Sequence, residues 1–593
     1  MAAKGNTQMF TILAQDPVVR GPGGELVFAR VAVPLETLSI GPTGYRLKVV
    51  DFNASTNRLY EAHNYATDAD GRIVDPYAVP NTGGVRARRR FENDVLADPK
   101  FHSQNTYAIV MRTLGRFEHA LGRRIGWGFD GHQLHVVPHA FVDANAFYSR
   151  EDRALVFGYF TGVDGERVFT CLSHDIVVHE ATHAILDGLR AGFMNESGPD
   201  QAGFHEGFAD VVALLSVFSL KEIIALALTG TDSLPVRTTD GIRLIDGNRL
   251  SAQALADGIL FSLGKQFGQQ LDGLRANALR QSLKIKPSRR LLQTEAYNEP
   301  HSRGEVFAAA MLRSMLELWL RRIKELGTFG PGMYNLDAVI AEGAKVADQL
   351  LTMAIRALDY CPPLDLEFGD YLAALLTVDS EVAPDDSRYG YRETIQKTFA
   401  SYGIDPPSAR TESDGCWKPF TAHDQTQYHK TNFDSMLRDC EEVFRFLWEN
   451  RALLNVDDQA YTQVISVRPS VRFGPDGFLL KETVCEYTMK ANIFGAEITA
   501  VCGIKRPAGI ETTTRLTVYG GGTLVFDPYG RIKYHIQRPL SDGAWQEKRI
   551  QYLLEQGLIG AQEPDVNPFA EVHRLRASAA RNQDSASKPE VNA

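Results

Sequence analysis

Residues 174–189, HDIVVHEATHAILDGL, place two histidines four positions apart with a glutamate directly after the first. On a helix, His179 and His183 share one face a turn apart, so their ring nitrogens can meet one zinc ion at about 2.0–2.1 Å. Glu180 lies beside them and can reach a water at the ion without binding the ion itself. This H-E-x-x-H pattern therefore predicts two zinc ligands and one general base.

The flanks of the motif argue against a chance match, which for so short a pattern arises in roughly a few per cent of chains of this composition. The stretches DIVV and AILDGL are apolar at helical spacing, which predicts a buried helix. Two imidazoles and a carboxylate on a buried face need partners, and a metal ion is the natural one.

A third ligand is expected from the segment 204–215, FHEGFADVVALL. It supplies Glu206 as the ligand, with Asp210 one helical turn further on to accept the outer N–H of a ligand histidine. An E-x-x-x-D pair is common in any helix. Its place 23 residues after the second histidine (183 to 206) makes it informative here.

The secondary structure predicted around these residues changes along the chain. β-forming residues dominate the first hundred positions, two short strand segments follow at 133–143 and 145–160, and a second β-rich block covers about 460–540. Helical periodicity prevails from Ser173 onward. We expect helices at Asn105–Leu121, Asp175–Ala191, Phe204–Ser219, Ala252–Phe267, Glu305–Leu326, Asp337–Leu358, Leu366–Asp379, Arg392–Ser401, Asp434–Asn450 and Trp545–Gln556.

The order H-E-x-x-H, then NESG at Asn195–Gly198, then E-x-x-x-D resembles the thermolysin family of gluzincin zinc peptidases over about residues 100–405. The resemblance implies an α+β, two-lobed fold with a zinc-binding central helix and an appended C-terminal α+β block. The corresponding divisions are a β-rich N-terminal lobe at 1–173, a helical lobe at 174–405, a linker at 406–433, an accessory domain at 434–560 and a disordered tail at 577–593.

The same resemblance assigns roles to residues outside the zinc motif. The sequence NAFY at 145–148 is similar to the edge strand that holds the peptide substrate, through Asn145 and the backbone of Ala146. His301, in PHSRGEVFAAAM, would donate a hydrogen bond to the oxyanion of the tetrahedral intermediate. Arg280 stands where an arginine that grips the substrate carbonyl is expected.

The chain also departs from the family pattern. Met194 directly precedes NESG where a tyrosine is expected, and Tyr148 and Tyr297 are the alternatives. Asp175 fits one calcium-ligand position, but Val217 stands where a further acid would be needed, so we expect the family's calcium cluster to be lost. Four extra residues separate NESG from the third zinc ligand.

Composition narrows the class of protein. A net charge of −10 disfavours nucleic-acid binding, and six scattered cysteines favour free thiols in a reducing compartment. The apolar run Glu222–Leu228 is too short to span a membrane. The basic run Arg86–Arg90 is expected to be a solvated patch at the start of a helix. With no secretory signal or propeptide recognised, we expect a cytoplasmic protein, although non-classical export stays open.

These observations predict a zinc-dependent endopeptidase acting on a peptide or protein substrate. An exopeptidase or another metallohydrolase is an alternative, but the acidic G-x-M-E-N strand of aminopeptidases does not occur in the sequence. A binding protein with a vestigial zinc site is a second alternative, which the intact Glu180 disfavours. The C-terminal block could cover the cleft or select substrates. Cleavage preference and oligomeric state stay open.

Overall fold

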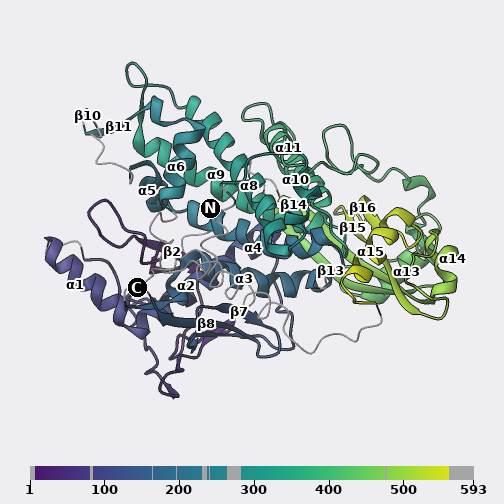
Figure 1. Cartoon of the computed structure of the whole chain (residues 1–593), viewed down its shortest axis with the longest axis horizontal. Coiled ribbons are helices and arrows are strands. Elements are labelled where there is room, and N and C mark those ends of the chain that lie inside the picture. The colour runs from purple at the N-terminus through teal and green to yellow at the C-terminus, as the bar shows by residue number, and fades with distance from the viewer. Residues whose placement is uncertain are drawn as a thin grey trace, which may run out of the picture.

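The computed structural model describes residues 7–80, 84–162, 165–194, 197–229, 237–239, 241–262, 282, 284–473, 477 and 479–559 (Figure 1). The fold is mixed α+β, with 44% helix and 22% strand. The predicted class is thus confirmed at this coarse level. The tail at 577–593 and the end of the helix expected at Ala252–Phe267 lie outside the described residues.

The N-terminal part combines a hairpin, a mixed sheet and two helices. The hairpin pairs β1 (Thr7–Leu13) with β2 (Phe28–Pro34). The sheet has the order β3-β6-β8-β7, with β9 also paired to β8, so β7 lies at its edge. The strands β3, β6 and β8 run parallel, whereas β7 and β9 run antiparallel to β8. Their bounds are Leu47–Val49 (β3), Leu134–Phe141 (β6), Ala146–Ser149 (β7), Ala154–Thr161 (β8) and Arg167–Phe169 (β9). Two further short strands, β4 (Phe52–Asn53) and β5 (Arg58–Leu59), pair with each other in a separate antiparallel ribbon.

Two consecutive helices pack against these strands. Helix α2 (Pro99–Leu121) begins at an Asp98 cap and ends at Gly122, whose φ of 68° is readily adopted only by glycine. Helix α1 (Gly84–Ala97) is not among the helices that we expected, because β-forming residues dominate the first hundred positions. The basic run lies in the first half of α1 and is largely exposed, as expected for a solvated patch at the start of a helix.

The second part is almost entirely helical. Helices α3, α4 and α8 pack at its centre, and Figure 1 shows α3 between the strands β7 and β8 on one side and α4 on the other. The helices are α3 (His174–Leu189), α4 (Pro199–Phe218), α5 (Lys221–Thr229), α6 (Ala252–Ser262), α8 (Pro300–Lys324), α9 (Leu336–Ala357), α10 (Phe368–Val382) and α11 (Tyr391–Ser401). A small sheet joins β10 (Arg237–Thr239), β11 (Ile242–Asp246) and β12 (Met333–Asn335).

Glycines bring α4 and α8 unusually close. A methyl group added at Gly207 would lie 2.7 Å from the carbonyl oxygen of Gly304, closer than real carbon atoms approach. The absence of a side chain at both positions allows near backbone contact between the two helices. This approach carries the start of α8 to the middle of α4.

The C-terminal part is a four-stranded antiparallel sheet with short helices, as the second β-rich block predicted. Its strands are β13 (Tyr461–Phe473), β14 (Leu479–Phe494), β15 (Arg515–Phe526) and β16 (Ile532–Arg538), paired in chain order. The helices are α12 (Phe433–Met436), α13 (Cys440–Glu449), α14 (Ile498–Cys502) and α15 (Gly543–Glu555). The single helix expected at 434–450 is therefore two helices, because Asp439 caps the start of α13.

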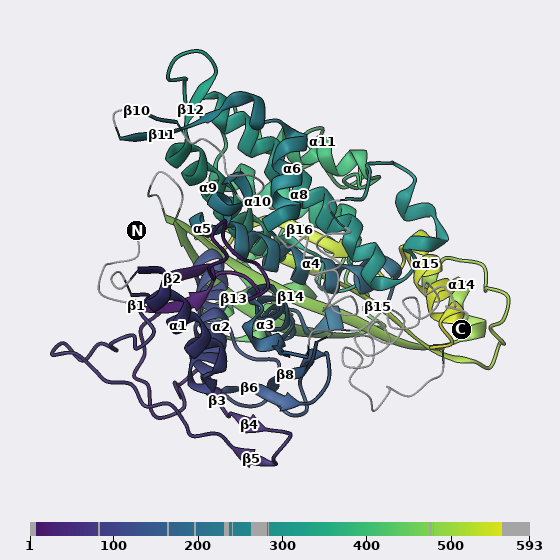
Figure 2. The same ribbon diagram turned by 60° about the vertical axis from the view of Figure 1, so that its left-hand side comes forward.

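This sheet has a hydrophobic core of its own and also reaches the rest of the chain. Figure 2 shows its long strands passing from the neighbourhood of α2 towards α14 and α15. The irregular segment at 406–433 is packed rather than loose. Trp417 is buried in the main core, and its indole N–H donates to the carbonyl of Tyr360 at 2.9 Å.

All six cysteines lie in the described residues, and they are free thiols, five buried and one exposed. Among the described helices, no single one is long and apolar enough to cross a bilayer. The pair α4 and α5 meets the criteria of length and composition only jointly and is bent by 81°.

Candidate active site

The H-E-x-x-H residues lie on the buried helix α3. His179 and His183 are 3% and 0% exposed, and their Nε2 atoms face each other at 2.7 Å. Apolar neighbours such as Val178, Ile185 and Leu186 bury the helix on its other sides, as the flanking pattern predicts. Glu180 is fully buried as well, and it neighbours His183 on the helix surface because the two are three positions apart.

Glu206 on α4 completes the cluster. Its Oε2 lies 3.4 Å from Nε2 of His179, and its Oε1 lies 3.6 Å from Nε2 of His183. One donor atom from each of the three residues lies within 4.8 Å of the other two. The structure thus brings together the three residues expected to be metal ligands.

Asp210 occupies the position expected from the sequence. Its Oδ1 accepts a hydrogen bond from Nδ1 of His179 at 2.8 Å. The carboxylate fixes the proton of that ring on Nδ1 and directs the lone pair of Nε2 towards His183 and Glu206.

The chemistry of this donor set fits zinc. Two imidazole nitrogens and one carboxylate converge in a buried space, and the outer nitrogen of one ring is held by a second carboxylate, an arrangement typical of zinc centres. Zinc bonds of about 2.0–2.1 Å in tetrahedral geometry separate ligand atoms by about 3.3 Å. The two nitrogen–carboxylate distances lie close to this value, whereas the two Nε2 atoms, 2.7 Å apart, would move about 0.6 Å further apart on binding the ion.

His301 reaches the same site from the first turn of α8. Its Nε2 is 3.5 Å from Oε2 of Glu206, and its Nδ1 is 2.6 Å from Oε1 of Glu299. Glu299 also caps α8, because its carboxylate accepts hydrogen bonds from the backbone N–H groups of His301 and Ser302. Burial opposes the charge on Glu299, but these bonds and the neighbouring histidine outweigh it and lower its pKa to about 2.

The expected substrate residues lie on and beside β7. The carbonyl of Asn145 accepts the N–H of Gly158 at 2.9 Å, so by alternation the backbone groups of Ala146 point away from β8. The side chain of Asn145 is buried, and its Oδ1 accepts the N–H of Ala146 at 2.9 Å. The third expected residue, Arg280, lies outside the described residues, as does Asn195 of the NESG sequence.

The two tyrosine alternatives have different surroundings. Tyr148 on β7 is buried, and its hydroxyl donates to Asp187 of α3 at 2.8 Å. Tyr297 is half-buried in the turn before α8, where its carbonyl accepts a hydrogen bond from Arg303 at 3.0 Å. The hydroxyl of Tyr148 is thus used in joining β7 to α3.

Sequence reasoning missed three residues that shape the site. Glu299 belongs to no motif, although its place two residues before His301 fits a helix cap. His205 stacks on His183 with the ring centroids 4.7 Å apart, and burial lowers the pKa of His205 to about 4, so the ring is neutral at pH 7. Asp187 accepts hydrogen bonds from Tyr148 of β7 and from Arg150, which directly follows that strand, and no spacing rule connects these three positions.

Neither the protein-family models nor the curated proteins searched match the chain. The geometry of the site is therefore the main basis for assigning a function.

Proposed function

We propose that the protein is a zinc-dependent endopeptidase with the two-lobed, thermolysin-like arrangement that its motifs imply. The observation that carries the proposal is the buried convergence of His179, His183 and Glu206, with Asp210 on the outer nitrogen of His179. A zinc ion held by these residues would act as a Lewis acid, making a water molecule acidic and polarising a peptide carbonyl.

Glu180 is the general base of the proposed reaction. Its carboxylate accepts a proton from the water that attacks the peptide carbonyl and returns it to the leaving amine. Its position on α3, directly after His179 and three residues before His183, supports this role because it places the carboxylate beside the expected metal ligands.

His301 supplies the hydrogen bond to the oxygen that becomes negative in the tetrahedral intermediate. Its Nδ1 is engaged with Glu299, so its Nε2 is directed towards the ligand cluster. Glu299 is a positioning residue in this scheme, because it acts on the substrate only through the imidazole.

The edge position of β7 supports an extended peptide as the substrate. A peptide strand can add to this edge through backbone hydrogen bonds, which favours cleavage within a chain over removal of a terminal residue. The packing of β7 against α3, through Tyr148 and Asp187, fixes this edge relative to the metal ligands.

The decisive experiment measures casein hydrolysis by the purified full chain, with and without a chelator, for the unchanged protein and for Glu180→Gln. We expect chelator-sensitive hydrolysis in the first and none in the second, with zinc content unchanged. The matched control is Glu222→Gln, at an exposed glutamate on α5, which should retain activity. Full turnover by Glu180→Gln would refute the general-base role. An unchanged protein that binds zinc but does not cleave casein would favour a binding function.

A further inference from the structure

A second cluster of metal-ligand side chains lies in the N-terminal part of the fold. His102 of α2, His139 of β6 and Cys171, in the 3-10 turn Thr170–Leu172, place one donor atom each within 4.8 Å of the others. All three are buried, with exposures of 1%, 1% and 0%. None of them belongs to the proposed active site.

The hydrogen bonds of the two rings determine where their protons lie. Nε2 of His102 is 2.9 Å from the carbonyl oxygen of Leu96, which can only accept, so this nitrogen is the donor. Nδ1 of His139 is 2.7 Å from Oδ1 of Asp51, and an ionised carboxylate likewise only accepts. A neutral imidazole has one N–H group. In each of these rings that group lies on the nitrogen that faces away from the other ring.

The inner nitrogens face each other with their lone pairs. Nδ1 of His102 lies 2.8 Å from Nε2 of His139, a distance at which two lone pairs repel each other unless a positive charge lies between them. That charge is either one extra proton shared by the rings or a metal ion bound by both lone pairs, which at zinc bonds of about 2.0–2.1 Å would widen the separation of the nitrogens to about 3.3 Å. The sulfur of Cys171 beside both nitrogens favours the metal, because a thiolate is a strong ligand for zinc.

The proposed active site has the same construction, which gives an internal comparison. There the Nε2 atoms of His179 and His183 face each other at 2.7 Å, and a carboxylate holds the outer nitrogen of the first ring. An outer acceptor orients the ring of His179 in the first site, and outer acceptors orient both rings in the second cluster. The second cluster differs in having a sulfur donor where the first has Glu206.

We propose that His102, His139 and Cys171 bind a structural zinc ion, with Asp51 and the carbonyl of Leu96 orienting the two rings. The thiol of Cys171 loses its proton when the ion binds. The site would tie α2 and β6 to the turn that precedes α3, because α3 begins at His174. It would thereby help to fix the start of the helix that carries the active-site histidines.

The surroundings of the cluster are apolar on one side and rigid on the other. The ring of Phe169 packs edge-on against His102 at 4.8 Å and against His139 at 5.2 Å between centroids. The side-chain amide of Asn105 donates to the carbonyl of Cys171 at 3.1 Å and fixes the turn to α2. Outer hydrogen bonds orient metal ligands, and a hydrophobic shell limits the access of solvent to a bound ion.

Metal content and cobalt spectra of the purified full chain test the proposal. We expect two zinc ions per chain, falling to one in Cys171→Ser and, separately, to one in His183→Ala. Cobalt exchanged into the chain should give a near-ultraviolet sulfur-to-cobalt charge-transfer band. Of the two clusters only the second contains sulfur, so the band should persist in His183→Ala and vanish in Cys171→Ser.

Cys485→Ser is the matched control, since Cys485 is equally buried, and it should keep both the ions and the band. Zinc content unchanged by Cys171→Ser, together with no sulfur band in the unchanged chain, would overturn the proposal and leave a proton between the rings. The spectrum of the unchanged chain decides the matter even if a variant fails to fold. Loss of zinc in Cys171→Ser but not in His183→Ala would support this site while counting against the proposed peptidase.

Discussion

Arg190, which caps the C-terminal end of α3, forms an ion pair with Glu486 of β14, and both side chains are buried. The same carboxylate also accepts a hydrogen bond from Arg468 of β13 at 3.0 Å. The C-terminal sheet is therefore joined directly to the helix that carries the proposed metal ligands. It is more than the appended block expected from the sequence.

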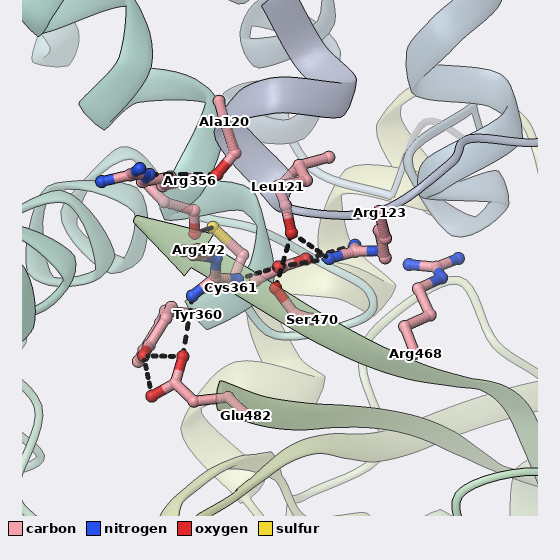
Figure 3. Close-up of polar contacts among 12 residues, drawn as sticks. Ala120, Leu121, Arg123, Arg356, Tyr360, Cys361, Arg468, Ser470, Arg472 and Glu482 are labelled. Carbon is pink, nitrogen blue, oxygen red and sulfur yellow. Dashed lines mark hydrogen bonds and ion pairs between the residues drawn. The ribbon is translucent and has the colours of Figure 1, made fainter. Parts of the chain in front are cut away.

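A second buried network joins the sheet to Arg123, just beyond the end of α2, and to the 3-10 turn Leu358–Tyr360 (Figure 3). Arg472 of β13 pairs with Asp359 and, at 2.7 Å, with Glu482 of β14. The hydroxyl of Tyr360 donates to the carboxylate of Glu482, and Arg123 binds both oxygens of Asp359 at 2.6 Å. Each of these buried charges has lost its hydration shell, so its stabilisation comes from the oppositely charged groups beside it.

We expect Glu486→Gln to destabilise the whole fold. The substitution removes the negative charge that balances Arg190 and Arg468, and an uncompensated buried charge costs about 3–5 kcal/mol. Urea unfolding measures the loss. Asp337→Asn is the control, since its ion pair with Arg243 is more than half exposed (58% and 51%) and should contribute below about 1 kcal/mol. Equal effects of the two substitutions would show that the buried pair is not important for stability.

The network at Asp359 predicts a pH dependence of stability. Burial raises the pKa of this carboxyl, but Arg123 and Arg472 outweigh burial and hold it well below its ordinary value of 3.8. A lowered pKa stabilises the fold above the unfolded value, and this stabilisation is lost as the pH falls below 3.8. The free energy of unfolding should therefore fall with acidification more steeply in the unchanged protein than in Asp359→Asn. Identical slopes for the two proteins would contradict the prediction.

The sequence predicted the site best where chemistry follows from local spacing. His179 and His183 are a helical turn apart, and Asp210 lies one turn from Glu206, so a helix is sufficient to align each pair. The contacts that join separate elements could not be predicted in this way. The cluster of Asp51, His102, His139 and Cys171 has no regular spacing and forms only when the sheet packs on α2.

Helix α1 shows a second limit of sequence reasoning. The stretch GVRARRRFENDVLA has few apolar residues, so no clear helical periodicity appears in it. Its buried contacts are Val95 and the charged Glu92, whose carboxylate accepts hydrogen bonds from Arg88 and from the backbone of Leu26. A helix held by tertiary ion pairs leaves little trace in a pattern of hydrophobicity.

We expect Asp210→Asn to weaken zinc binding without abolishing it. The amide is nearly the same size as the carboxylate but is a weaker acceptor for Nδ1 of His179, so the imidazole becomes a poorer ligand. Substitutions at such positions typically lower metal affinity about 10–100-fold. Titration with a competing chelator measures the change. An affinity equal to that of the unchanged protein would show that the carboxylate does not act on the metal through His179.

The role of Glu299 predicts a kinetic effect separate from substrate binding. If Glu299 holds His301 for the developing oxyanion, Glu299→Gln should lower kcat while leaving KM nearly unchanged, because that hydrogen bond strengthens only in the transition state. We expect a loss of about 10-fold, against about 10²–10³-fold for His301→Ala, the loss typical of removing an oxyanion donor. Glu295→Gln, at an exposed glutamate in the preceding turn, is the control and should change neither constant.

The double variant separates positioning from simple destabilisation of α8. If Glu299 acts only through the imidazole, adding Glu299→Gln to His301→Ala should cause no further loss of kcat, because the ring that it orients is already absent. Additive losses in the double variant would mean that Glu299 acts on the reaction independently, or that weakening the cap of α8 disturbs the site as a whole. Unfolding measurements on the three variants distinguish these two cases, since only a weakened cap also lowers stability.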